Sequence, residues 1–270
     1  MDENIKYIGL FAESNAIEVA NFCVYLDSPI DHADIRRFDE SREIKDLYPA
    51  INSPDMLQIR IGNQRQGSSS PPPVPVKQLN HYRPDGKPDW TGSFGENRIL
   101  VSCHFYDSWE SVWLDAKKRL DLLLGCVDQY KNIFSIDYSV TDTFSARRAD
   151  ESLVPSNLFK DNEFIAKYIL KSKDNRWDFS QGWFENPTTQ DQVLMRIEGQ
   201  GGIENDVVIA SIVNLYSQRP STKVAVKDLL DSVDGNSILD QVFEQFHDQN
   251  KRLLRQLLVD GLLDRMGLGE

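Results

Sequence analysis

Alternating apolar and polar residues predict β-strands along much of the chain. The pattern covers Ala16–Leu26, Met56–Gly62, Glu96–Phe105 and Asn132–Ala146. A period of two places the apolar side chains on one face of a sheet and the polar ones on the other. Three later segments predict successive antiparallel strands, and GQGGIEN between the second and third supplies turn residues for a hairpin. These segments are WDFSQGWFEN, QVLMRIEG and NDVVIASIVNLYS.

Three other segments have the spacing of amphipathic helices. The first runs from Ile30 and ends near Pro49, and the second covers Tyr106–Gly125. Asp107 and Glu110, three residues apart, predict a capping box at the start of the second helix. The third and longest helix is predicted over Ile238–Leu258, with a continuous apolar side and a charged side opposite.

The order of these elements predicts an α+β fold with two antiparallel sheets, each covered by long amphipathic helices. Strand, turn, strand and long helix occur once in each half, which suggests an internal β-β-α duplication. We expect an N-terminal half over residues 1–150 and a C-terminal half over 151–270, packed as one compact unit. Residues 62–92 are rich in Gly, Ser and Pro and predict a surface loop.

Composition narrows the classes of protein that the chain can represent. Its 270 residues are 40% hydrophobic, which is enough to bury a core. The net charge of −12 makes nucleic acid an improbable partner and favours a basic one. Three widely spaced cysteines, the absence of a bilayer-spanning apolar run and an acidic start without a signal-peptide pattern predict a cytoplasmic protein.

His247 and Asn250 are the two polar residues that break the pattern of the last predicted helix. His247 projects near the border between the apolar and charged sides. We therefore expect its ring to rest on apolar neighbours with one nitrogen in water, without a functional role. Asn250 lies inside the apolar sector, where a buried amide needs a hydrogen-bond partner. We expect it to bond a neighbouring strand or to fix a helix–helix register.

The sequence contains no assembled catalytic or metal-binding motif. Its four histidines lack the paired spacing of metal ligands, and GQGGIEN matches neither phosphate-loop template. We therefore expect no cofactor and no metal, and favour the absence of catalysis. The alternative is an enzyme acting on nucleotides or nucleic acid, with a site between the two halves formed by His104, Asp137 and Asp142.

The favoured hypothesis is a non-catalytic binding protein. It would be an adaptor, inhibitor or immunity-like partner of a larger effector, in the setting of a prokaryotic defence or toxin system. The densest aromatic region, Trp177, Phe179, Trp183 and Phe184, is the predicted surface for another protein. A homodimer joined through the long helices fits either hypothesis.

Several segments resemble a known family. NAIEVANFCVYLDSPI with LYP after the next helix, YDSWESVWLDAKKRL leading into NIFSIDYSVTDTF, and VFEQFHDQNKRLLRQLLVDGLLDRMG together span most of the chain. They resemble a highly divergent, sporadically distributed family of prokaryotic proteins of similar length, known by a family number. The resemblance implies a bacterial or phage-related cytoplasmic α+β protein and carries over no catalytic residue. The Ser/Pro-rich loop and the segment SIDYS depart from that family's pattern.

Overall fold

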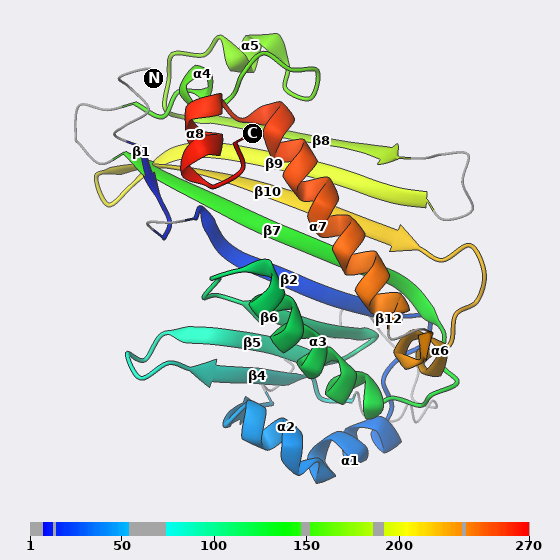
Figure 1. Cartoon of the computed structure of the whole chain (residues 1–270). Coiled ribbons are helices and arrows are strands. Elements are labelled where there is room, and N and C mark those ends of the chain that lie inside the picture. Colours follow the sequence, from blue (N-terminus) through cyan, green and yellow to red (C-terminus); the bar gives the residue numbers. More distant parts are fainter. Residues whose placement is uncertain are drawn as a thin grey trace, which may run out of the picture.

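A single antiparallel sheet organises the chain (Figure 1). The computed structural model describes residues 8–12, 15–53, 74–146, 152–185, 192–233 and 236–269. The sheet has ten strands in the order β3-β4-β5-β6-β2-β7-β10-β9-β8, with β1 also paired to β7. They are β1 (Ile8–Leu10), β2 (Ile17–Leu26), β3 (Ala50–Asn52), β4 (Lys77–Tyr82), β5 (Pro88–Gly95), β6 (Arg98–Cys103), β7 (Ile133–Ala146), β8 (Trp177–Glu185), β9 (Gln192–Glu204) and β10 (Val207–Arg219).

The remaining elements are helices and one small hairpin. The hairpin joins β11 (Ser232–Val233) to β12 (Asn236–Ser237). The helices are α1 (His32–Glu40), α2 (Arg42–Leu47), α3 (Trp109–Gly125), α4 (Pro155–Leu158), α5 (Lys167–Leu170), α6 (Val226–Leu230), α7 (Ile238–Leu257) and α8 (Asp260–Arg265). The two long helices, α3 and α7, lie on the same face of the sheet (Figure 1).

The prediction of two separate sheets is wrong, because β7 joins both halves. This strand hydrogen-bonds to β2 along one edge and to β10 along the other. The ladder therefore runs from the N-terminal half into the C-terminal half without an interruption. The alternation in the sequence shows which face a side chain takes but not which strand lies alongside, so it is the same for one sheet or two. The predicted division at residue 150 stays a prediction.

Two other local predictions also need correction. Strand β4 and the start of β5 lie inside the region predicted as a loop over 62–92. Helix α3 has Ser108 as its N-cap, and its side chain accepts a hydrogen bond from Ser111 N; no capping box with Asp107 forms. The predicted strand Met56–Gly62, and with it one part of the proposed duplication, lies outside the described residues.

The prediction that β8, β9 and β10 are three successive antiparallel strands is confirmed. The turn between β9 and β10, however, falls at Asn205 and Asp206, whose φ angles of 48° and 66° are left-handed. The glycines of GQGGIEN lie within β9 instead. Rings from β8 cover two of them, Phe179 over Gly199 and Trp177 over Gly201, and a Cβ at either position would collide with the ring.

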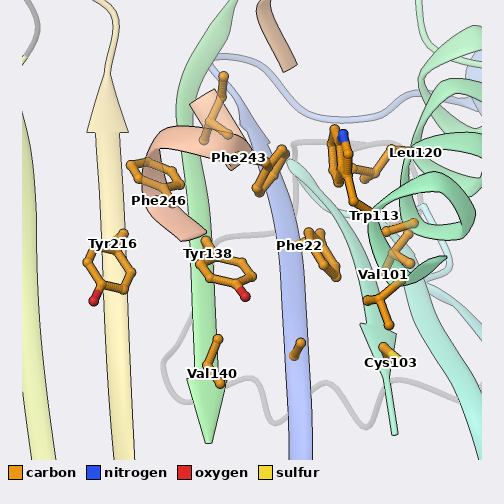
Figure 2. Close-up of a cluster of buried hydrophobic side chains, with 14 of the residues drawn as sticks. Phe22, Val101, Cys103, Trp113, Leu120, Tyr138, Val140, Tyr216, Phe243 and Phe246 are labelled. Carbon is orange, nitrogen blue, oxygen red and sulfur yellow. The ribbon is translucent and has the colours of Figure 1, made fainter. Parts of the chain in front are cut away.

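The core lies between the sheet and the two long helices. Phe22 of β2 is its centre, with ring centroids 5.3 Å from Tyr138, 5.7 Å from Trp113 and 5.4 Å from Phe243. Figure 2 shows these rings reaching from two strands, α3 and α7 toward one another. From Ile136 to Phe144, every even-numbered side chain of β7 is buried on this covered face. The odd-numbered ones are half-buried on the opposite face.

Candidate functional site

A cavity of about 240 Å³, lined by both polar and apolar residues, lies between β7 and α7. Asp142 contributes to its wall from the sheet, and His247 and Asn250 contribute from α7. The segment before α3 adds Tyr106, and the C-terminal turn around Gly267 completes the wall. The lining thus comes from both halves of the chain.

Asp142 is the most unusual residue of this cavity. Its side chain is fully buried, and within the described residues neither carboxylate oxygen has a hydrogen-bond partner. Burial raises the pKa of this carboxyl group to about 7, because the charged form is poorly solvated there. A buried carboxyl group that no protein group stabilises is rare and points to a bound molecule or to a chemical role.

His247 is buried, so the prediction of a border position with one nitrogen in water is wrong. The residue is only 7% exposed, and its ring stacks on the indole of Trp109. The expected solvent-facing border of α7 is covered because α3 begins directly beside it. Burial, and to a smaller extent the charge of Lys251, lowers the pKa of His247 to about 4. Neither ring nitrogen has a hydrogen-bond partner in the described part of the chain.

Asn250 confirms the expectation of a bond to a neighbouring strand. Its Oδ1 accepts hydrogen bonds from Asn214 Nδ2 at 2.9 Å and from the Tyr216 hydroxyl at 3.3 Å, both on β10. Asn250 also lines the cavity. Asn250 is three residues after His247, so both project from one side of the helix.

The structure does not bring His104, Asp137 and Asp142 together. Asp137 is five residues before Asp142 on β7, so the two carboxyl groups lie on opposite faces of the sheet. Asp137 accepts a hydrogen bond from Ser217 Oγ at 2.7 Å, and burial raises its pKa. His104 Nε2 lies 2.9 Å from Thr91 Oγ1. Thr91 follows Trp90, whose ring packs under Arg119 of α3, so His104 is also on the opposite face.

The aromatic residues predicted as a protein-binding surface differ in burial: Trp177 is buried, Phe179 and Trp183 are half-buried, and Phe184 is exposed. Trp177 donates its indole N–H to Leu153 O at 2.9 Å, and Phe179 packs on Phe159. Trp183 stacks on the ring of Phe164 with centroids 4.9 Å apart. Phe184, in contrast, is 57% exposed on the edge strand. Their role in binding a partner stays a prediction.

A larger groove of about 870 Å³ runs between α2 and α3. It is open, and Leu47, Leu114 and charged side chains line it. None of the buried polar atoms without a partner in the described chain belongs to a residue of this groove. We therefore take the smaller cavity around Asp142 as the candidate site, since of these two cavities it is the one lined by buried polar groups without partners among the described residues.

Few features of the sequence indicated this cavity. Asp142 and His247 are far apart in the chain, and neither belongs to a motif. The local signals were the pair of polar residues at 247 and 250 on one side of an apolar helix and the position of Asp142 on the apolar face of its strand.

Comparisons with family models, with curated proteins and with solved structures found no match to this chain. Within the described ranges, no helix combines the length and the apolar character needed to cross a bilayer. The described His, Cys, Asp and Glu residues also form no group of three that is arranged to hold a metal ion.

Proposed function

We propose that this protein is a non-catalytic binding protein whose ligand occupies the cavity between β7 and α7. The observation that carries the proposal is the fully buried carboxyl group of Asp142, which has no partner among the described residues. A buried polar group without a hydrogen bond costs about 1–3 kcal/mol, and more if it is charged. A ligand that donates to Asp142 removes this cost, and the same energy then favours binding.

The size of the cavity limits the ligand. At about 30 Å³ for each water molecule of liquid, 240 Å³ corresponds to about eight waters. This lies below the range of about 300–1,000 Å³ for drug-sized ligands, so the molecule is small. The walls support a preformed site, because β7 is paired on both edges and α7 begins at a capping box formed by Ser237 and Asp240.

Two tryptophans on α3 offer a direct test by NMR. Trp109 lines the cavity and donates its indole N–H to Glu244, whereas Trp113 donates to Asp240 and does not line it. The indole signals, assigned with Trp109→Phe, are followed while a library of small polar fragments is added. We expect a subset of fragments to shift the Trp109 signal and to leave Trp113 nearly unchanged. If no fragment at millimolar concentration does so, the proposal is wrong.

A second candidate is an acid–base enzyme that acts on a small molecule in the same cavity. The specific observation in its favour is the pair of opposite pKa shifts, about 7 for Asp142 and about 4 for His247. Near pH 6 the first would be a neutral acid and the second a neutral base, a combination typical of proton-transfer sites. Nucleotides and nucleic acid suit this cavity poorly, because it is small and the chain carries a charge of −12.

Recovery of the bound molecule distinguishes the two candidates. A binding protein returns its ligand unchanged after prolonged incubation. An enzyme converts it, with a rate that is highest between about pH 4 and pH 7 and is lost in both Asp142→Asn and His247→Phe.

The proposal extends to partner and location. An adaptor, inhibitor or immunity-like protein also docks on a larger effector, and the charge of −12 favours a basic surface on that partner. Cys23, Cys103 and Cys126 are buried free thiols, which supports a reducing compartment such as the cytoplasm. A pull-down from the native host should return one stoichiometric protein, and its failure would contradict the adaptor role.

A further inference from the structure

We infer that the ligand of the cavity is a small organic cation with a primary ammonium group, seated on Asp142. This inference rests on the proposed function and adds the chemical class of the ligand. It starts from the charges that face the cavity. Asp142, Asp107 and Glu110 are acidic residues of the lining, and among its described residues Lys251 is the one lysine or arginine, with His247 held neutral by burial. The lining therefore carries an excess of negative charge when Asp142 is ionised.

The hydrogen-bonding capacity of the buried groups also fits an ammonium ion. An ionised carboxylate only accepts hydrogen bonds, and a neutral imidazole has one accepting nitrogen. Within the described residues, no protein donor bonds to Asp142 or to the ring of His247. An ammonium group supplies three hydrogen-bond donors for these acceptors and one positive charge for the carboxylate. At a fully buried carboxylate, such a charge-assisted hydrogen bond is stronger than a neutral one.

The other ligand classes fit less well. An anion could accept hydrogen bonds from Asn250, Lys251, the Tyr106 hydroxyl and the one N–H of His247, but it would be held beside the carboxylate of Asp142. A neutral alcohol would leave the charge of an ionised Asp142 without a counterion. Only a cation both compensates the charge and uses the free acceptors.

Three compounds of nearly equal shape test the inference: butylamine, butan-1-ol and butyrate. Each is titrated at pH 7.5 into the whole protein, and binding is followed by the Trp109 indole signal and by calorimetry. We expect butylamine to bind at least about tenfold more tightly than the other two, which is the equivalent of one charge-assisted hydrogen bond. A short lysine-containing peptide forms a fourth arm, because an ammonium group can come from a free amine or from a protein side chain. Tighter binding of the peptide than of butylamine assigns the cation to a partner protein.

Asp142→Asn is the critical variant, since it keeps the shape of the side chain and removes the charge. We expect it to weaken butylamine binding about tenfold or more. Asp137→Asn is the matched control, because Asp137 lies on the same strand but on the opposite face. It should leave butylamine binding unchanged. Circular dichroism and the melting temperature at pH 5 verify that both variants are folded.

The outcomes separate this inference from the proposed function. Equal binding of butanol or butyrate, or unchanged butylamine binding by Asp142→Asn, overturns the ammonium assignment and leaves the cavity as a binding site. If no compound of the fragment library shifts the Trp109 signal, the proposed function itself fails, and this inference fails with it.

Discussion

The rings of Trp109 and His247 are stacked in parallel, with centroids 4.0 Å apart and planes inclined by 5°. Trp109 is the first residue of α3, and His247 lies in the middle of α7. The same indole donates a hydrogen bond to Glu244, one turn before His247, at 2.9 Å. Two contacts from α7 therefore hold the indole in the wall of the cavity. They also keep the imidazole away from water, which favours its neutral form.

This burial predicts that His247 destabilises the protein in acid. Its pKa is lowered from 6.5 to about 4 in the folded state, so the unfolded chain binds more protons between these values. The stability present above pH 6.5 is therefore lost as the pH falls toward 4, by up to about 3 kcal/mol. His247→Phe keeps a ring on Trp109 but does not titrate. In urea unfolding at pH 7.5 and pH 4.5, this variant should lose less stability than the wild type. Equal losses would show that the ring is not buried.

Asp142 predicts the opposite dependence of the free energy of unfolding on pH. Its folded pKa is raised from 3.8 to about 7, so the folded state binds more protons between these values. Its contribution to stability is fully present below pH 3.8 and is lost as the pH rises through 7, by up to about 4 kcal/mol. Asp142→Asn removes this dependence. Without ligand, its free energy of unfolding should rise relative to wild type between pH 4 and pH 8. Asp248→Asn, on the exposed side of α7, is the control and should show no such gain.

The link between Asn250 and β10 should be a measurable stabilising interaction. Asn250→Leu removes the acceptor for Asn214 and for the Tyr216 hydroxyl, and leaves both groups buried. We expect a loss of about 1–3 kcal/mol in the free energy of unfolding. The double variant Asn214→Leu and Asn250→Leu should lose less than the sum of the two single variants, since it leaves fewer unpaired groups. A higher melting temperature for Asn250→Leu alone would exclude this role.

Two neighbouring glycines of β9 should respond differently to the same substitution. In Gly201→Ala the new Cβ collides with the indole of Trp177, whereas in Gly202→Ala it meets open space. Displacing Trp177 also breaks its hydrogen bond to Leu153 O. Gly201→Ala should therefore cost about 1–3 kcal/mol, as overpacked sites do. Gly202→Ala should stay within about 0.5 kcal/mol of wild type. Thermal and urea unfolding measure both, and equal effects would contradict the packing of β8 on β9.

The sequence by itself determined the five longest strands and the two long helices, because their signals are local. Alternation over Asn132–Ala146 identified β7, and the apolar spacing predicted a helix over Ile238–Leu258, where α7 covers Ile238–Leu257. The same reasoning placed Asn250 on the apolar side, where it does bond a strand. A strand or helix with one buried face has apolar residues at one regular spacing, so this spacing is sufficient to identify the element.

Only the tertiary structure decided how the two halves join and where the candidate site lies. The pairing of β7 with β10 made one sheet from the predicted two, and no local pattern encodes which strand is the neighbour. The burial of His247 depends on Trp109, a residue far away in the chain that covers a helix border that otherwise would face solvent. Asp142 likewise lies on the buried face of β7 between Val140 and Phe144, and the absence of a partner for it among the described residues becomes visible only when the elements packed around it are in place. Contacts of this kind are non-local, so their energies are set by packing and not by sequence spacing.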